Sequence, residues 1–257
     1  MMIHSTAIIH PGAKLGENVS VGPYSVIGEH VSIGAGTSVG AHTVIEGWTT
    51  IGEENRIGHS ASIGAVPQDL KFHGEQTSLT IGDRNSIREF VTMHLGTEDG
   101  GGQTIVGNDN LFMVYSHVAH DCRVGNRVVM ANCATLAGHV EVGDYAILGG
   151  LSAYHQFVRV GAHCMISGGS MVVQDLPPYV NAQGDRAKPA GINSTGLSRR
   201  NFSDEAIRAI KNAYKIVYRS DLKLDEALAK IDADYGSFAE IRYFTEFIRG
   251  SERGITR

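Results

Sequence analysis

The stretch Leu15-Gly-Glu-Asn-Val-Ser-Val-Gly-Pro-Tyr-Ser25 contains the pattern that decides the fold: an aliphatic residue at every sixth position, usually followed by glycine. The same spacing runs from Ile9 to Ile63, returns at Ile81, and continues in a shifted phase from Val106 to Val172. A period of six is neither helical nor a simple two-residue alternation. A repeat this short is typical of a solenoid, in which each unit packs only against its neighbours.

Each six-residue unit fits one short strand and one corner, with the aliphatic side chain pointing inward and glycine relieving the turn. Three units form a coil of 18 residues, and successive coils pair as parallel strands about 4.8 Å apart. The sequence therefore predicts a mainly β fold, a triangular parallel β-helix. Residues 65–78 and 96–104 break the phase, and we expect them to be inserts.

The repeat stops at Asp175-Leu-Pro-Pro-Tyr179, where we expect two adjacent prolines to end strand pairing. From Ser203, an expected N-cap, the pattern becomes helical. The first of these helices has an apolar stripe made of Ile207, Ile210, Tyr214 and Val217. Two more helices are expected, near Asp225 and around 238–248. We predict a β-helix over 1–191 and a C-terminal helical domain over 192–257, packed on its end.

Composition narrows the function classes. Residues 1–198 hold 10 Lys and Arg against 17 Asp and Glu, whereas residues 199–257 hold 12 against 10, so the bulk charge does not indicate nucleic-acid binding. The three cysteines lack CxxC spacing, which favours a reducing compartment over a disulfide framework. No stretch resembles a signal peptide or approaches the ~18 apolar residues of a membrane span. We therefore expect a cytoplasmic protein.

The 18-residue coil predicts which residues stack on one another. His120, Gly138 and Gln156 are 18 apart and share one column, Asp121 and His139 share the next, and His155 belongs to the column before. These residues, with His117 three positions before His120, should lie on one corner of three consecutive coils, spanning about 10 Å. A structural solenoid has no need of such a cluster, so the sequence predicts a functional site there.

General base catalysis suits this cluster. A neutral imidazole at His120 can accept a proton from a hydroxyl, and the adjacent Asp121 can fix its tautomer. The Gly138 amide, one coil away, can stabilise a developing oxyanion because glycine admits close approach. Cys122 occupies an inward position and is expected to be buried rather than nucleophilic. If the protein is a transferase, these features favour direct transfer of a group to its acceptor over a covalent enzyme intermediate.

Several segments resemble one known family over essentially the whole chain, the helical tail included. They are Gln68-Asp-Leu-Lys71, Ile81-Gly-Asp-Arg-Asn85, Ile87-Arg-Glu89, His117-Val-Ala-His-Asp-Cys122, Leu136-Ala-Gly-His139, His155-Gln-Phe157 and Gly196-Leu-Ser-Arg-Arg200. They are similar to the UDP-N-acetylglucosamine O-acyltransferases, which carry out the first step of lipid A biosynthesis. The resemblance implies a left-handed β-helix, an exception to the usual right-handed crossover.

The resemblance also implies an activity. The chain would move an (R)-3-hydroxyacyl group from acyl carrier protein to UDP-N-acetylglucosamine, without a cofactor, as a homotrimer with active sites between subunits. His120 would act as base on the 3-hydroxyl of the sugar, oriented by Asp121, and the Gly138 amide would hold the thioester oxyanion. Whether the acceptor carries a 3-hydroxyl or a 3-amino group stays open, as does the acyl length.

Further residues match family positions that contact substrates. Those implied to line the nucleotide-sugar and acyl groove are Gln68, Asp69, Lys71, His117, His139, His155 and Gln156. Those implied on the uridine and phosphate side are Asn193, Arg199 and Arg200, and cationic side chains suit a diphosphate. Thr195 stands where many members carry Glu, so the resemblance does not carry that nucleotide contact over to this chain.

Two more expectations concern the acyl donor. Gly168 matches the position at which side-chain size limits acyl length, and glycine would leave the groove open to longer chains. The carrier protein is acidic, and basic residues at helical spacing form a candidate docking face for it. These are Arg208, Lys211, Lys215 and Arg219, which a solvated helix surface would also explain.

Three alternatives remain at this stage. The N-acyltransferase of the same pathway shares the repeat but normally has an extra N-terminal domain, and here the repeat begins by Ile9. A zinc carbonic anhydrase of the gamma class uses the same fold, with two histidines four residues apart. The closest pair here is His117-x-x-His120, so we predict no metal. The third alternative is a non-catalytic solenoid that only binds a partner.

Overall fold

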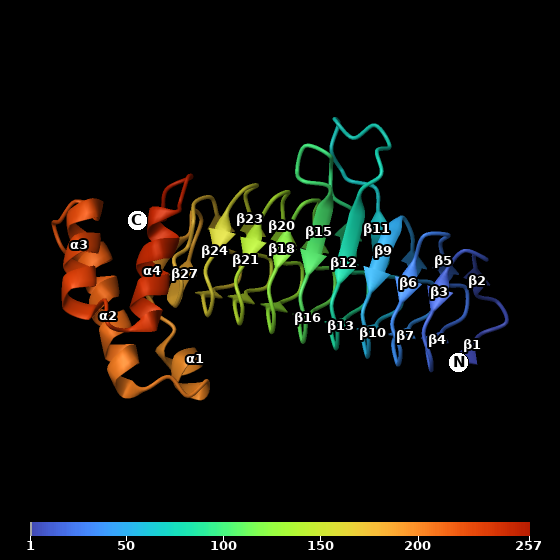
Figure 1. Ribbon diagram of the computed structural model, residues 1–257, viewed down its shortest axis with the longest axis horizontal. Coiled ribbons are helices and arrows are strands. Elements are labelled where there is room, and N and C mark those ends of the chain that lie inside the picture. The colour runs from blue at the N-terminus through green and yellow to red at the C-terminus, as the bar shows by residue number, and fades with distance from the viewer. Residues whose placement is uncertain (1) are drawn as a thin grey trace.

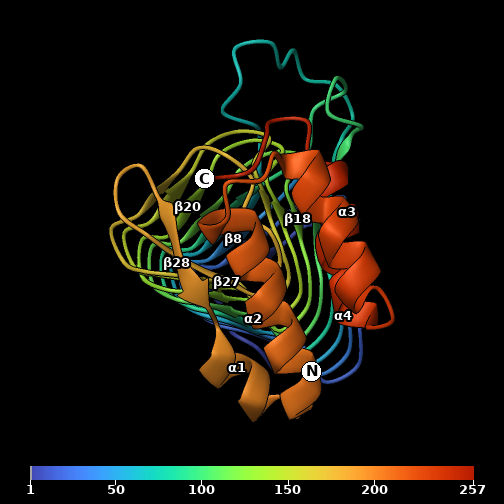
Figure 2. The same ribbon diagram turned by 90° about the vertical axis from the view of Figure 1, so that its left-hand side faces the viewer.

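The computed structural model describes residues 2–257. It contains a left-handed parallel β-helix of triangular cross-section, with four helices at its C-terminal end (Figures 1 and 2). The chain winds around three faces in turn, and each face is one sheet built from successive coils. Among the described residues, no helix has the length and apolar run that a membrane crossing needs.

Most strands are two residues long, because each face of the triangle is short. The first face contains β1 (Met2–Ile3), β4 (Ser20–Val21), β7 (Ser38–Val39), β10 (Arg56–Ile57), β13 (Ser86–Ile87), β16 (Leu111–Phe112), β19 (Val129–Met130), β22 (Ile147–Leu148), β25 (Met165–Ile166), β27 (Val180–Gln183) and β28 (Lys188–Ile192). The second face contains β2 (Ile8–Ile9), β5 (Val26–Ile27), β8 (Val44–Ile45), β11 (Ser62–Ala65), β14 (Thr92–His94), β17 (His117–Val118), β20 (Thr135–Leu136), β23 (Ala153–Tyr154) and β26 (Met171–Val172). The third face contains β3 (Lys14–Leu15), β6 (Ser32–Ile33), β9 (Trp48–Ile51), β12 (Ser78–Ile81), β15 (Gln103–Val106), β18 (Arg123–Val124), β21 (Glu141–Val142) and β24 (Arg159–Val160).

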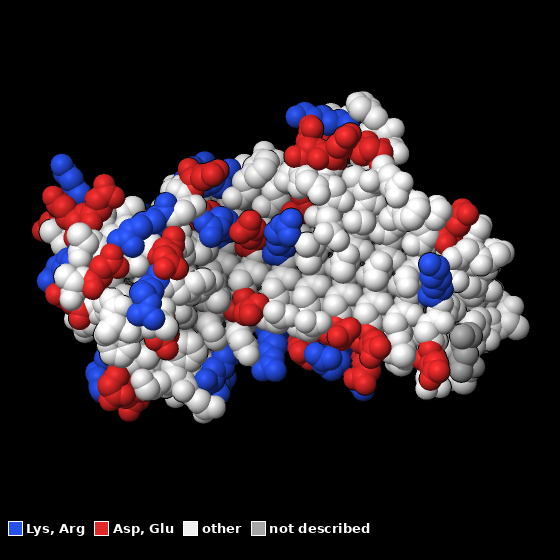
Figure 3. Space-filling model, viewed as in Figure 1, with Lys and Arg blue, Asp and Glu red and all other residues white. Residues whose placement is uncertain are grey.

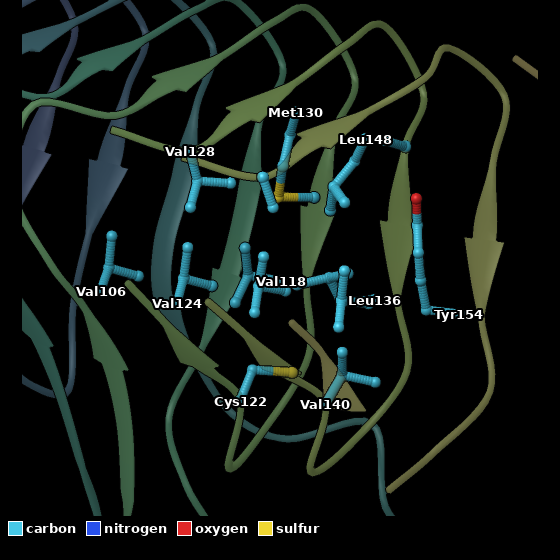
Figure 4. Packing of buried hydrophobic residues seen from close by; sticks show 14 of the residues in the cluster. Val106, Val118, Cys122, Val124, Val128, Met130, Leu136, Val140, Leu148 and Tyr154 are labelled. Carbon is cyan, nitrogen blue, oxygen red and sulfur yellow. The ribbon is translucent and has the colours of Figure 1, made fainter. Parts of the chain in front are cut away.

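The predicted coil length is confirmed by the strand register. Thr135 pairs with His117 on one side and with Ala153 on the other, so each partner lies one predicted coil away. The second residue of nearly every short strand is the aliphatic one, and its side chain points into the prism and is buried. Figure 4 shows these side chains stacked in columns, with Val106 and Val124 in one column and Leu136 and Tyr154 in another.

Two loops interrupt the coils where the sequence breaks its phase. Ser78 pairs with Trp48 in the coil before it and with Gln103 in the coil after it, and both intervals are longer than the regular coil. The strands before and after them leave residues 66–77 and 95–102 as the loops. Both project from the same side of the β-helix (Figure 1).

The prediction that the prolines end strand pairing is wrong. β27 follows Pro177 and Pro178 and still pairs in parallel with β25. The N–H groups that reach the preceding coil belong to the flanking residues, Leu176 and Tyr179, which donate to Arg159 and Ala162 (both 2.9 Å). The two prolines lie between those donors at a corner, where the coil needs no N–H. β28 then pairs antiparallel with β27 and closes the end of the first face.

The helical part begins with α1 (Ser194–Arg199), which the sequence pattern did not predict, and continues with α2 (Asp204–Arg219), α3 (Leu224–Tyr235) and α4 (Ala239–Arg249). The predicted cap is confirmed, since the Ser203 hydroxyl accepts a hydrogen bond from the Ala206 N–H (3.1 Å). The tail returns to the β-helix, where the Ser251 hydroxyl donates to the Asp175 carboxylate (2.8 Å). The helices are therefore anchored to the last coils of the β-helix. Charged side chains are most frequent at this helical end of the molecule (Figure 3).

An aromatic stack links the β-helix to α1. Tyr145 and His163 lie one coil apart with nearly parallel rings 4.8 Å between centroids, and the Arg200 guanidinium covers Tyr145 at 4.7 Å. The Asn193 side-chain amide donates to the His163 carbonyl (2.9 Å). Burial, with a smaller effect of Arg200, lowers the pKa of His163 to about 4. His163 is therefore neutral in the folded chain at neutral pH.

This burial predicts an acid-dependent loss of stability. Between pH 6.5 and about 4 the unfolded chain binds a proton at His163 that the folded chain resists, so stability falls as the pH is lowered through this window. His163→Phe keeps a stacking ring without the titration. Urea unfolding at fixed protein concentration should show that the variant loses roughly 1–2 kcal/mol less than wild type between pH 7 and 4.5. An identical pH dependence of the two proteins would contradict this assignment.

Candidate active site

One corner of the β-helix, between the second and third faces, brings together His120, Asp121, Gly138 and His139. The chain turns there between β17 and β18, and again one coil later between β20 and β21. Asp121 and His139 both have left-handed backbone conformations, with φ of 60° and 62°. The His139 N–H donates to the His120 carbonyl (3.0 Å), which joins the two turns. We call this group of residues the His120 corner, and its proximity agrees with the predicted columns.

His120 and Asp121 form a hydrogen-bonded pair. His120 Nδ1 lies 2.8 Å from Asp121 Oδ2, and the imidazole side chain is 13% exposed while the carboxylate is 1% exposed. A proton on Nδ1 makes this a donor to the carboxylate and leaves Nε2 as the basic nitrogen. The arrangement is that of an oriented general base.

The second loop holds the Asp121 carboxylate in place. Oδ1 accepts from the Thr97 N–H (2.9 Å) and Oδ2 accepts from the Thr97 hydroxyl (2.7 Å). Burial acts to raise the pKa of Asp121, but the hydrogen bonds from His120 and Thr97 outweigh it, so the pKa lies below its usual value. The carboxylate is therefore ionised at neutral pH. Sequence reasoning located the loop but did not identify Thr97, since a single threonine in an insert carries no pattern.

Gly138 lies directly against the His120 ring. A Cβ atom at Gly138 would be 2.5 Å from His120 Cε1 and 2.6 Å from Nε2, so only glycine fits beside this rotamer. Among residues 2–257, no group accepts a hydrogen bond from the Gly138 N–H. The corner thus presents a basic nitrogen and a free amide donor next to each other.

His139 extends the corner towards the next coil. Its Nε2 atom lies 3.8 Å from Asp121 Oδ2, and its ring stacks on Phe157 at 4.2 Å and meets His120 edge-on at 5.1 Å. Burial, partly opposed by the Asp121 charge, lowers the pKa of His139. His120, Asp121 and His139 also offer ligand atoms within 4.8 Å of one another, which is a geometry that a metal ion can use.

A fifth histidine, His94, joins the cluster. Its ring meets His117 edge-on at 4.9 Å, and His117 Nδ1 is 2.6 Å from the Thr92 hydroxyl. Burial lowers the pKa of both imidazoles, that of His117 to about 4 with further lowering by His94 and His120. Sequence reasoning missed His94 because the second loop lengthens its coil, so that Thr92 pairs with His117. Ala119 shares the column of His155. The same longer interval that separates Thr92 from His117 also separates His94 from Ala119, so His94 belongs to that column too.

The remaining residues predicted near this corner lie at its edges. His155 and Gln156 are exposed one coil further along, where His155 Nδ1 contacts the Gln156 carbonyl oxygen (3.1 Å). Asp69 lies on the first loop, accepts from the Lys71 N–H (3.0 Å), and is close enough to affect the pKa of His139. Gln68 and Lys71 on the same loop are exposed. A groove of about 820 Å³ runs from Asp121 along the third face to the C-terminal segment.

Other predicted residues lie on different corners of the same chain. Asn193 and Arg200 belong to the corner between the third and first faces, beside Tyr145. The Asn193 side chain caps α1 by accepting from the Gly196 N–H (3.0 Å), so it is already used by the fold. Arg199, at the end of α1, is exposed. Gly168 is exposed on the third corner, between the first and second faces. One chain therefore does not bring all the predicted residues to one place.

The predicted basic helix face borders a groove. Arg208, Lys211, Lys215 and Arg219 are exposed on α2 and line a groove of about 900 Å³ between α2 and β28. Apolar side chains, Ile207 among them, form part of its lining. Arg208 also pairs with Glu205 (2.9 Å), whereas the other three cations form no ion pair within the described chain.

Cys122 is buried, as expected from its inward position. Its thiol donates to the Ala137 carbonyl (3.1 Å), and burial raises its pKa to about 12. A thiol in this state is not a nucleophile at neutral pH.

Comparison with known proteins gives two family matches. The family described as Udp N-acetylglucosamine O-acyltransferase, Domain 2, matches residues 175–256, and the bacterial transferase hexapeptide repeat matches residues 103–138. The acyl-[acyl-carrier-protein]–UDP-N-acetylglucosamine O-acyltransferase of Janthinobacterium is 56% identical, over 100% of this chain and 99% of its own length. The protein of the same name from Burkholderia orbicola is 55% identical over 99% of both chains.

Two solved structures are also similar to this chain over its full length. The UDP-N-acetylglucosamine O-acyltransferase of Moraxella catarrhalis superposes with a TM-score of 0.97 at 44% identity, covering 100% of both chains. The UDP-N-acetylglucosamine acyltransferase of Bacteroides fragilis gives a TM-score of 0.97 at 46% identity, again over 100% of both chains.

The close approach of Gly138 to His120 makes a testable prediction. Gly138→Ala should displace the imidazole and break its hydrogen bond to Asp121, at a stability cost of about 1–3 kcal/mol. Proton NMR should then lose the low-field signal of the His120 Nδ1 proton. Gly150→Ala is the matched control, because its new Cβ meets no atom closer than 3.3 Å. An unchanged signal in Gly138→Ala would mean that the pair does not depend on this glycine.

Proposed function

We propose that this chain, which belongs to the UDP-N-acetylglucosamine O-acyltransferase family, moves an (R)-3-hydroxyacyl group from acyl carrier protein to the 3-position of UDP-N-acetylglucosamine, the first step of lipid A biosynthesis. Two relatives at 55–56% identity over the full length support the substrates. The observation that carries the chemistry is the His120–Asp121 pair with the free Gly138 amide beside it.

In the proposed mechanism, His120 Nε2 accepts the proton of the sugar hydroxyl while that oxygen attacks the thioester carbonyl carbon. Asp121, held by Thr97, keeps the other imidazole proton on Nδ1 and stabilises the imidazolium. The Gly138 N–H donates to the oxyanion of the tetrahedral intermediate. Collapse breaks the carbon–sulfur bond, and the departing thiolate takes the proton from His120. These steps use only protein groups and the two substrates, with no cofactor.

Direct transfer is favoured over a two-step covalent route. The thiol nearest to His120 in sequence, Cys122, is buried with a raised pKa. The Thr97 side chain is buried and its hydroxyl is held on Asp121, so a substrate cannot reach it. The acceptor hydroxyl is then the group that His120 deprotonates.

We place the complete site between subunits of a homotrimer. Support comes from the distribution of predicted substrate contacts over three corners of a rigid prism, which one chain cannot bring together. A neighbouring copy can present its Arg199, Arg200 and Asn193 corner to the His120 corner of the first chain. One wall of the nucleotide-sugar site would then be lined by His139, His155 and Gln156, together with the loop residues Gln68, Asp69 and Lys71.

Gly168 is proposed to set the room for the acyl chain. It is exposed, and a Cβ there would meet only the Gly150 backbone, at 3.1 Å. Gly168 is thus an exposed position without a side chain, which supports a preference for longer acyl chains.

The acidic carrier protein is proposed to dock on α2. Three cations without an ion pair in the described chain surround a groove with apolar lining, which suits a partner that is both acidic and amphipathic. The cytoplasm is the proposed location, and the three free cysteines fit a reducing compartment.

The activity itself can be tested by acyl transfer from a panel of acyl carrier protein donors to both the 3-hydroxyl and the 3-amino acceptor. Wild type should acylate one acceptor, and His120→Ala should lower kcat/KM about 10²- to 10⁴-fold because the base is gone. His42→Ala is the control, since His42 is an exposed histidine stacked on Tyr24 away from the corner. No transfer by wild type to either acceptor would refute the function, and equal rates for His120→Ala would refute the base.

The docking face makes a separate prediction. Lys211→Glu with Lys215→Glu should raise KM for the acyl carrier protein donor about tenfold at low salt, with kcat at saturating donor and KM for the nucleotide sugar unchanged. Added salt should reduce the difference, because it screens exposed charges. Lys230→Glu on α3, whose lysine pairs with Asp234, is the matched control. An unchanged donor KM at low salt would exclude this face.

A further inference from the structure

The corner that supplies the base also has the donor set of a transition-metal site. His120 Nδ1 and His139 Nε2 both face the Asp121 carboxylate, at 2.8 and 3.8 Å from Oδ2. The ligand atoms of the three residues lie within 4.8 Å of one another. They come from two adjacent turns whose backbones are joined by a hydrogen bond, so the three side chains start from fixed positions.

In place of the sequence-based prediction of no metal, we propose that His120, Asp121 and His139 bind one divalent transition-metal ion, such as Zn²⁺, and that this ion reversibly inhibits the enzyme. Binding stands on the geometry alone, whereas inhibition rests on the proposed function.

The distances are close to those that a metal requires. Zn²⁺ binds imidazole nitrogen at about 2.0–2.1 Å and carboxylate oxygen at about 2.0–2.2 Å, so neighbouring ligand atoms in a tetrahedral site are about 3.3 Å apart. His120 Nδ1 and Asp121 Oδ2, which are 2.8 Å apart, must separate slightly to bind one ion. The ring of His139 must move towards them by no more than about 1.5 Å. His139 can do this, because its side chain makes no hydrogen bond within residues 2–257 and is 21% exposed.

The chemistry of the three groups fits the ion. Asp121 is ionised and anchored, and the Thr97 hydroxyl and N–H hold its oxygens as the outer hydrogen-bond donors of metal sites do. His139 presents a ring nitrogen without a hydrogen-bond partner in the described chain, from a partly buried position. Two imidazoles and one carboxylate leave coordination positions open for water, the pattern of three-ligand zinc sites.

Metal binding would remove the general base by a tautomer switch. In the metal-free pair the imidazole proton of His120 is on Nδ1, facing Asp121, and Nε2 is free to accept a proton. A metal ion on Nδ1 displaces that proton, and the neutral ring then carries its proton on Nε2. Such a ring cannot accept the proton of the acceptor hydroxyl, so transfer stops until the metal leaves.

Metal binding is tested first on the purified protein without substrates. Isothermal titration with Zn²⁺ should show one ion per chain, with saturation by about 0.1 mM, and Co²⁺ should give visible absorption typical of four or five ligands. His139→Gln and Asp121→Asn should each weaken binding at least about tenfold. Thr97→Val, which removes the hydroxyl donor to Asp121, should weaken it about 10- to 100-fold.

Matched controls exclude other sites on the chain. His42→Gln removes an exposed histidine elsewhere, and Cys133→Ser removes the thiol that is not fully buried, so both should bind Zn²⁺ as wild type does. Circular dichroism and thermal unfolding confirm that each variant is folded. The proposal is overturned if wild type fails to bind Zn²⁺, if His139→Gln and Asp121→Asn bind it normally, or if Cys133→Ser abolishes binding.

The inhibition is tested in the acyl-transfer assay. Zn²⁺ at the concentration that saturates the site should suppress transfer, and a chelator should restore it fully. Full activity with the site saturated would overturn the inhibitory role. The titration and the Co²⁺ spectrum do not depend on acyl transfer, so failure of the proposed function and failure of the metal site give different results.

Discussion

Backbone hydrogen bonds between successive coils determine where every side chain of the β-helix lies. A backbone N–H in one coil donates to the carbonyl of the residue just before its counterpart in the next coil, as Gly16 does to Ile33 (2.8 Å), and this holds the coils in register. Because the register is fixed, residues one coil apart in sequence are neighbours in space. The His120 corner is a direct consequence, since Asp121 and His139 are adjacent only through that ladder.

The same ladder tolerates inserts, provided that they leave and return at a corner. Both loops begin and end next to the second and third faces, and β12 and β15 resume the ladder after them. The second loop is then available to support a buried carboxylate, through Thr97, that the regular coil alone does not satisfy. The interruption of the repeat therefore completes the site instead of weakening the solenoid.

Much of the fold and of the site could be predicted from the spacing of residues in the sequence. The coil length, the two interruptions, the Ser203 cap and the proximity of His120, Asp121, Gly138 and His139 follow from local spacing, because a solenoid converts sequence intervals into distances. Other features escaped it for identifiable reasons. His94 was hidden by a loop that lengthens its coil. The effect of Pro177 and Pro178 was misjudged because their missing N–H groups fall at a corner, where no ladder bond is made. α1 has only six residues, too few to show a helical period in the sequence, and its cap, Asn193, does not reveal it either.

The sequence by itself determined the β-helix and which residues share each column, since both depend on a backbone period that the residues display directly. Only the tertiary structure decided how those columns function. It placed Thr97 on the Asp121 carboxylate, left the Gly138 N–H without an acceptor in the described chain, and put Arg200 beside Tyr145, on another corner from His120. These outcomes depend on loop conformation, side-chain direction and the position of α1. Such features arise from contacts between distant segments, which no local interval encodes.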